Sequence, residues 1–198
     1  MKAHMLTVSG SDFVPCRLTI ADIRIEDIAH ALSLICRFGG HTKEHYSVAQ
    51  HSLLVSRILA SAGASPEIQL AGLMHDAHEA YIGDIPTPIK NALGSVWKAL
   101  EAQAANTVLD AFCLNRVMRQ HKSIIKQADL VALATERRDL TSFDTNRNLA
   151  WDILNGVSPF LEPASSGSWT PRWWAEQFLD RFTDLRDTAA ILPTEAAA

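Results

Sequence analysis

Apolar residues recur at helical spacing wherever this chain shows any period. Between 25 and 36 the apolar positions, Ile28 and Leu32 among them, follow one another at steps of three and four residues. That spacing places them on one face of a helix, which is the face that a helix buries. No two segments show the alternation that is typical of paired strands. The sequence therefore predicts an all-α fold.

Caps and prolines indicate where the helices begin. Ser47 and Gln50 have the spacing of a capping box, in which the two side chains satisfy free backbone N–H groups at a helix start. Ser65-Pro66 and Thr170-Pro171 each pair a capping side chain with a proline at the first helical position. We expect helices over 25–36, 47–63, 65–82, 95–112 and 121–140, and a last helix from 171 onward.

Prolines also predict the connections between helices. Pro86 and Pro88 lack a backbone N–H and restrain the residues before them, so we expect a stiff loop over 84–88. A second loop is expected over 159–168, and frayed chain over 188–198. In the helix over 95–112, apolar residues such as Val96 are expected to face inward. The expected organisation is an N-terminal segment over 1–24, a single domain over 25–186 and a flexible tail over 187–198.

Length and charge argue against several classes of protein. A chain of 198 residues with 47% hydrophobic and 20% charged residues fits one globular domain. No apolar run reaches the roughly 20 residues of a membrane span, and residues 1–14 lack the apolar stretch of a secretory signal. We therefore expect a cytoplasmic protein that does not bind membranes. A net charge of −4 argues against a nucleic acid polymer as partner.

The cysteines argue against disulfide bonds, whereas the histidines are candidates for a functional site. Cys16, Cys36 and Cys113 form no C-x-x-C pair, which argues against a disulfide framework and against a zinc site built from cysteines. Eight histidines are many for this length, and five of them fall within 38 residues: His41, His45, His51, His75 and His78. The histidines are therefore the first functional lead.

Three polar groups stand where the helical pattern predicts core: His51, the pair His75-Asp76, and Asp129. A carboxylate is costly to bury unless it is paired or bound to a metal. Taken singly, each group could be a core histidine or an acid paired with an arginine. Together, two imidazoles and two carboxylates from three helices are typical of a divalent-metal site with open coordination positions.

The order of these residues resembles the H…HD…D pattern of the HD-domain metal-dependent phosphohydrolases. The segment from His75 to Lys90, HDAHEAYIGDIPTPIK, closely resembles the corresponding part of the bacterial 5′-deoxynucleotidases of the YfbR type. Related bacteriophage deoxynucleoside triphosphate triphosphohydrolases are similar there too. The resemblance covers about 25–136, and it implies a single HD-domain helical bundle with a metal site in its core.

The resemblance also implies roles for individual residues. The implied ligands of a divalent ion, which could be Mn, Co, Zn, Fe or Mg, are His51, His75, Asp76 and Asp129. Glu79 matches the acid that positions or deprotonates the attacking water. Arg37 matches an arginine that orients the phosphate, and Phe38, where the family nucleotidases have tryptophan, matches a ring that packs on the nucleotide. Asp84 matches a residue of the sugar and water network, and the same substrate-contacting loop contains Ile85, Pro86 and Thr87.

Two lysines match residues that contact phosphate in the triphosphohydrolase relatives. Lys90 closes the matching segment, and Lys126 lies one helical turn before Asp129, so its side chain should project toward the metal side. Each lysine could equally be a solvated surface charge.

The function implied by the resemblance is hydrolysis of the 5′-phosphate of deoxyribonucleoside monophosphates by metal-activated water. Two alternatives stay open: a deoxynucleoside triphosphate triphosphohydrolase of the dATP type that releases triphosphate, and a non-catalytic nucleotide-binding HD module. The implied partners are a small deoxynucleotide and further copies of the chain, in a homodimer or higher homo-oligomer. His41 and His45 could form a small metal pair and His78 a proton relay, but the sequence assigns them no role.

Overall fold

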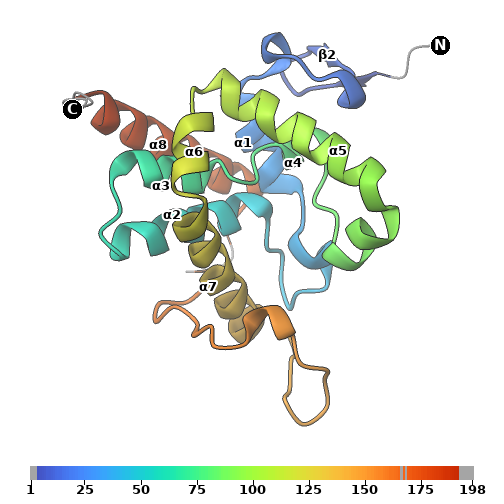
Figure 1. Ribbon diagram of the computed structural model, residues 1–198, viewed down its shortest axis with the longest axis vertical. Helices are drawn as coiled ribbons and strands as arrows, with labels where there is room; N and C mark the ends of the chain where they lie inside the picture. Colours follow the sequence, from blue (N-terminus) through green and yellow to red (C-terminus); the bar gives the residue numbers. More distant parts are fainter. Residues whose placement is uncertain (1–3, 166, 168, 192–198) are drawn as a thin grey trace.

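Helices form most of this chain, as the apolar spacing predicts (Figure 1). The computed structural model describes residues 4–165, 167 and 169–191. Within them the α-helices are α1 (Ile25–Leu34), α2 (Val48–Ser61), α3 (Pro66–Leu73), α4 (Glu79–Ile82), α5 (Thr87–Ala111), α6 (Asn115–Gln120), α7 (Lys122–Leu140) and α8 (Pro171–Ile191). The shorter elements are β1 (Met5–Leu6), β2 (Asp12–Phe13) and the 3-10 turns η1 (Pro15–Arg17), η2 (Ile20–Asp22), η3 (Arg37–Gly40) and η4 (Asp152–Leu154). None of the helices in the described ranges has the length and apolarity needed to cross a membrane.

A small hairpin before α1 contradicts the expectation of no paired strands. β1 and β2 pair antiparallel, with Met5 opposite Phe13. Strands of two residues are too short to show the alternation by which strands are recognised. The hairpin is tied to α1 by Ser9, whose backbone N–H and hydroxyl donate to the two carboxylate oxygens of Asp27 at 2.9 and 2.8 Å.

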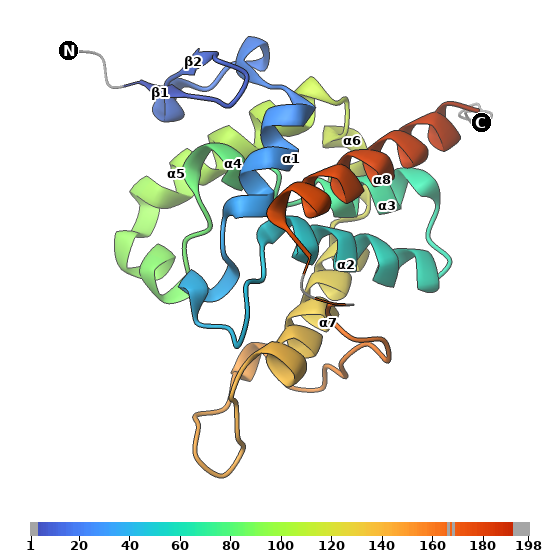
Figure 2. The same cartoon turned by 180° about the vertical axis from the view of Figure 1, so that it is seen from behind.

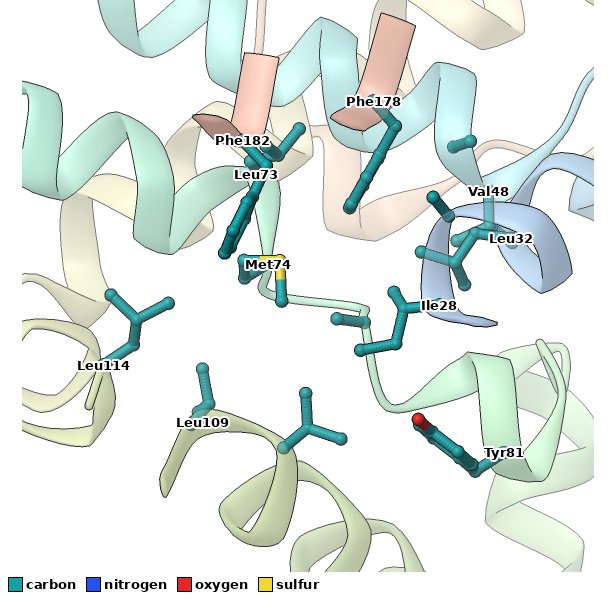
Figure 3. Packing of buried hydrophobic residues seen from close by; sticks show 14 of the residues in the cluster. Ile28, Leu32, Val48, Leu73, Met74, Tyr81, Leu109, Leu114, Phe178 and Phe182 are labelled. Carbon is teal, nitrogen blue, oxygen red and sulfur yellow. The ribbon is translucent and has the colours of Figure 1, made fainter. Parts of the chain in front are cut away.

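The core lies where α1, α2, α3 and α8 meet. α8 packs against α1 and α3, as Figure 2 shows, while α2 packs against α3 and α7. Phe178 and Phe182 of α8 point into the same cluster as Leu73, Met74 and Ile28 (Figure 3). Burial of such large apolar side chains is the main stabilising contribution, at roughly 1.5–3 kcal/mol each. The packing fixes α2, which carries His51, and α3, whose end leads into the turns with His75 and Asp76.

α2 begins where the capping box of Ser47 and Gln50 predicts it. The backbone N–H of Gln50 donates to Ser47 Oγ at 3.4 Å, and the backbone N–H of Ser47 donates to Gln50 Oε1 at 2.9 Å. Both residues are buried. The cap therefore fixes the first turn of α2, which carries His51.

The helix expected over 65–82 is interrupted. α3 ends at Leu73 and α4 begins at Glu79, and the residues between them form a series of tight turns. The backbone N–H of His75 donates to Gly72 O, and that of Glu79 donates to Asp76 O. These bonds span three residues rather than four, so the prediction of one continuous helix was wrong.

α5 begins inside the loop that was expected over 84–88. Pro88 lies in the first turn of the helix, where a missing N–H group is tolerated. The helix bends at Gly94, whose φ of 66° lies in the left-handed region that glycine adopts readily. The buried residues of α5 all lie in its second half, at Ala104, Val108 and Leu109, so the first half lies at the surface and Val96, expected inside, is 80% exposed.

The last helix runs further than predicted. α8 continues to Ile191 and crosses the boundary expected at 187, so 188–190 are helical rather than frayed. The rest of the expected tail, 192–198, lies outside the described residues. The helix expected over 121–140 is confirmed as α7, preceded by the short α6 that the sequence did not reveal. The described part of 159–168 is irregular chain, as expected.

Candidate metal centre

The structure brings together the four residues that the sequence predicts as metal ligands. They come from α2 (His51), from the turns between α3 and α4 (His75 and Asp76) and from α7 (Asp129). Within the described ranges, His51, His75 and Asp76 form a group whose donor atoms all lie within 4.8 Å of one another. Asp129 Oδ1 lies 3.3 Å from His51 Nε2 and 3.9 Å from His75 Nε2. Three separate elements therefore supply one cluster of donors.

The two imidazoles point their Nε2 atoms at each other. His51 Nδ1 lies 2.5 Å from a carboxylate oxygen of Glu136, and His75 Nδ1 lies 2.7 Å from Gly72 O. Both partners are acceptors, so each Nδ1 carries the hydrogen. The Nε2 atoms lie 3.4 Å apart, and two lone pairs that face each other require a proton or a cation between them.

The spacing and chemistry of the donors suit a divalent metal ion. Ligand bonds of about 2.1 Å to a first-row ion put neighbouring ligand atoms about 3.0–3.4 Å apart. The distances from Asp76 Oδ2 to His75 Nε2 and His51 Nε2 are 3.1 and 3.6 Å. Imidazole nitrogen with carboxylate oxygen is a donor set that Zn, Fe, Mn and Co accept. The residues present therefore fit such an ion.

The break between α3 and α4 allows two adjacent residues to direct their donor atoms to the same metal position. In an α-helix with 3.6 residues per turn, neighbouring side chains diverge by about 100°. His75 and Asp76 lie in the tight turns instead, and their donor atoms approach to 3.1 Å. The helix interruption is therefore part of the way the site is built.

The carboxylates of the centre are held in their charged form. Although burial opposes it, the His75 imidazole keeps the pKa of Asp76 well below its usual range. Burial also opposes ionisation of Asp129, yet the hydrogen bond from His51 lowers its pKa. Burial lowers the pKa of His51, but the nearby carboxylates outweigh it and raise the value to about 10. Without an ion, protonated His51 supplies the positive charge that the carboxylates require.

Glu136 is the central residue that sequence reasoning missed. It is fully buried on α7; Oε1 accepts from His51 Nδ1, and Oε2 accepts from Arg37 Nη2 at 3.1 Å. A carboxylate behind a ligating imidazole fixes the ring and increases its basicity. The signal was present in the sequence, because Glu136 follows Asp129 by seven residues and so shares its helix face.

Arg37 joins the centre from η3. Its guanidinium donates to Glu136, and Nη1 lies 3.7 Å from Asp84 Oδ2. Burial would lower the pKa of Arg37, but these carboxylates raise it, so the side chain stays charged. Its Nε is buried with no hydrogen-bond partner among the described residues. A buried donor without a partner favours a ligand at this point.

Glu79 is buried beside the donor cluster at the start of α4. Its Oε1 lies 3.8 Å from Lys90 Nζ, while Oε2 has no hydrogen-bond partner within the described residues. Burial raises the pKa of Glu79 well above its usual range, and the charges of Asp76 and Asp84 raise it further. Burial likewise raises the pKa of Asp84, against the opposing charge of Arg37. A carboxyl with a raised pKa can accept a proton near neutral pH.

The two predicted lysines both lie against carboxylates. Lys90 Nζ lies 2.5 Å from Glu101 Oε1, and Lys126 donates to Asp129 Oδ2 at 2.7 Å. Lys126 therefore projects toward the donor cluster, as its spacing predicts. The remaining predicted loop residues follow Asp84 along the chain; two are half-buried and the last is exposed: Ile85, Pro86 and Thr87.

The other histidines lie outside the donor group of the described chain. His41 and His45 are exposed. His78 is buried, and its Nε2 has no hydrogen-bond partner within the described residues. Burial lowers the pKa of His78, which keeps its imidazole neutral.

Two cavities lie away from this centre. One, of about 530 Å³, is lined by α2, α8 and the segment around Phe160, with Arg57 and Arg181 facing three carboxylates. The other, of about 490 Å³, lies between α1, α8 and Val8. Neither lining includes a metal-centre residue. The donor geometry, rather than the size of a cavity, therefore locates the candidate site.

Comparisons with known proteins place the chain among uncharacterized bacterial relatives. It is 39% identical over 181 residues to the uncharacterized protein YfdR of Escherichia coli strain K12, across 91% of this chain and 94% of that protein. It is 40% identical over 130 residues to an uncharacterized protein of Rhodobacter capsulatus, across 63% of this chain and 66% of the other. No protein-family model matches the chain.

Proposed function

The chain belongs to the family of the uncharacterized Escherichia coli protein YfdR, and we propose that it is a metal-dependent HD-domain phosphohydrolase that removes the 5′-phosphate of deoxyribonucleoside monophosphates. The observation that carries the proposal is the facing pair of imidazole Nε2 atoms, at 3.4 Å, with carboxylates on either side. Arg37 and Glu79, the two residues that the sequence resemblance assigns to phosphate and water, lie beside it.

His51, His75, Asp76 and Asp129 would hold the ion. A divalent ion bound there would acidify a water molecule and neutralise phosphate charge. Glu79, whose raised pKa suits a base, would take the proton of the attacking water. The water oxygen would form the new bond to phosphorus and the bond from phosphorus to O5′ would break. O5′ would then take the proton held by Glu79 and leave as the deoxynucleoside alcohol.

Arg37 would orient the phosphate. Its planar fork suits two phosphate oxygens, and its contacts with Glu136 and Asp84 hold the side chain before a substrate arrives. The free Nε is a donor that a phosphate oxygen would satisfy. A charge fixed in a buried place stabilises the transition state without reorganisation.

Triphosphohydrolase activity is the second candidate, and the position of Lys126 favours it. Its side chain is 56% exposed and lies against Asp129 at the outer edge of the centre. A cation at this edge would suit the further phosphates of a triphosphate. The non-catalytic alternative is tested by the same assay.

The assay begins with protein stripped of metal and resupplied with Mn, Co, Zn, Fe or Mg. Deoxynucleoside mono- and triphosphates and their ribose counterparts are offered, and phosphate and triphosphate are measured separately. We expect phosphate from the deoxynucleoside monophosphates. Triphosphate release instead would establish the second candidate. Absence of turnover by folded, ion-loaded protein would overturn both hydrolase candidates.

The role of Glu79 is tested by Glu79→Gln, with Glu67→Gln on the exposed start of α3 as the matched control. The first variant should retain its ion and lose at least about 100-fold in kcat, because general base catalysis contributes roughly 10²–10⁴-fold. The control should keep wild-type kcat. Undiminished turnover in Glu79→Gln would remove Glu79 from the mechanism.

A further inference from the structure

Three aromatic rings from separate segments form a row beside the metal centre. Phe38 lies in η3, Phe143 follows α7, and Trp151 precedes η4. The ring centroids of Phe38 and Trp151 are 6.2 Å apart, and those of Trp151 and Phe143 are 6.0 Å apart. We call these three residues the aromatic row. Phe143 and Trp151 lie outside the 25–136 region that carries the sequence resemblance.

The row is joined to the metal centre through one arginine. The guanidinium carbon of Arg37 lies 5.4 Å from the centroid of the Phe38 ring, while Nη2 of the same guanidinium donates to Glu136. Glu136 in turn contacts His51. A ligand whose phosphate meets Arg37 therefore has the aromatic row within reach of its other end.

A second arginine holds the outer part of the row. The guanidinium carbon of Arg137, the neighbour of Glu136 on α7, lies 4.5 Å from the Phe143 ring centroid and 5.6 Å from that of Trp151. Cations over ring faces at such distances are attractive. The segment between α7 and η4, which carries Phe143 and Trp151, projects at the bottom of Figure 1. Arg137 of α7 contacts both of these rings.

The backbone at Phe38 is held in an unfavourable conformation. Its φ of 55° and ψ of 25° are left-handed, and the two glycines that follow also have positive φ. A bulky residue rarely adopts this region, and such strain concentrates at sites where a side chain has to be aimed. The ring of Phe38 is thus fixed between Arg37 and Trp151.

We propose that Trp151, supported by Phe38 and Phe143, stacks on the base of the bound deoxynucleotide and is a specificity-determining residue. This inference rests on the proposed nucleotidase function. Stacking uses the π-face that every base has, so it separates nucleotides from sugar phosphates more than it separates one base from another. Purines, with the larger face, bind more tightly than pyrimidines.

The first test compares a nucleotide with its base-free counterpart. In the manganese-loaded protein, kcat/KM is measured for deoxyadenosine 5′-monophosphate and for 2-deoxyribose 5-phosphate. The wild type should prefer the nucleotide by about 10-fold or more, the usual effect of one stacked base. Trp151→Ala should raise KM for the nucleotide about 10-fold and leave the sugar phosphate unaffected, and Trp151→Phe should restore most of the preference.

The control variant is Trp169→Ala. Trp169 is 52% exposed and stacks on Trp173 of α8, outside the aromatic row. It should keep the wild-type preference. If Trp151→Ala is folded, as its circular dichroism would report, and still prefers the nucleotide as the wild type does, the inference is overturned.

A second readout needs no turnover. Stacking quenches indole fluorescence, so deoxyadenosine 5′-monophosphate should quench the wild type and Trp169→Phe, and should quench Trp151→Phe much less. Equal quenching of Trp151→Phe overturns the inference. A protein that hydrolyses neither compound with any metal but shows quenching that depends on Trp151 would support the stacking site and overturn the proposed hydrolysis. Failure of the stacking inference is therefore distinguishable from failure of the proposed function.

Discussion

At the residue scale, Glu136 joins His51 of the candidate metal centre to Arg37, the residue proposed to orient the phosphate. One oxygen of its buried carboxylate accepts from His51 and the other from Arg37. Burial opposes its charge, but Arg37 and then His51 lower the pKa of Glu136. A change at this residue should therefore act on ion binding and on phosphate orientation together.

Glu136→Gln should weaken ion binding by about 10–100-fold, the usual consequence of losing a carboxylate behind a ligating histidine. The amide keeps the shape of the side chain but carries no charge to support the imidazole. Manganese affinity is measured by titration calorimetry, with folding followed by circular dichroism. Glu162→Gln, at a side chain that is 62% exposed, is the control. Wild-type affinity in Glu136→Gln would show that the contact does not support the ion.

Ion binding should release a proton. The pKa of His51 is raised to about 10 without the ion, because nearby carboxylates outweigh burial. At pH 7 the imidazole is therefore protonated, and an ion that takes Nε2 must displace that proton. The ion-bound state holds fewer protons, so affinity should rise with pH, by about 10-fold per unit between pH 7 and 9.

Calorimetry in buffers of different ionisation enthalpy measures this proton directly. The apparent binding enthalpy should change with the buffer, with a slope near one proton per ion. A binding enthalpy that is the same in all buffers would contradict the protonated state of His51.

At the element scale, a helix end that has a local sequence signal can be predicted. A helix end that depends on tertiary contacts at the candidate site cannot. Ser47 and Gln50 predict the start of α2, and the structure confirms that the helix begins directly after Ser47. Residues 74–78 contain neither glycine nor proline, so nothing local stops a helix at Leu73. The interruption follows from tertiary contacts that bring His75 and Asp76 to one point, and such contacts override local preference.

The packing of α2 on α3 depends on Gly72. A Cβ added there would lie 2.2 Å from Leu59 Cδ1, whose side chain is buried. Gly72→Ala should lower the free energy of unfolding by about 1–3 kcal/mol, the usual effect of overpacking. Urea denaturation measures it. Leu59→Ala removes the clash, so the double variant should lose less than the sum of the two single variants. Additive losses would mean that the clash with Leu59 is not what destabilises Gly72→Ala.

At the scale of the whole molecule, the donors tie three elements together. α2, α7 and the turns between α3 and α4 each contribute at least one donor. The sequence indicated this set in two ways, since each donor is a polar residue where the helical pattern predicts core and their order resembles that of the HD-domain phosphohydrolases. The aromatic row could not be predicted in this way, since Trp151 reaches Phe38 only through the course of the chain after α7.

An ion that ties three elements should stabilise the fold. At 100 times its dissociation constant a ligand adds about 2.7 kcal/mol to the free energy of unfolding, which raises the melting temperature by roughly 5–10 °C for a chain of this size. Thermal scans with manganese and with a chelator measure the shift. His75→Ala should abolish it, and His45→Ala, at an exposed histidine, should retain it. An equal shift in His75→Ala would place the ion elsewhere.

The donors lie far apart along the chain, and this separation determines when during folding an ion can bind. A chain folded only as far as α4 holds His51, His75 and Asp76 but lacks Asp129 and Glu136, which arrive with α7. Contacts between segments so far apart in sequence form late. Tight capture of an ion should therefore need the finished molecule, and the time course of capture during refolding would report when α7 docks.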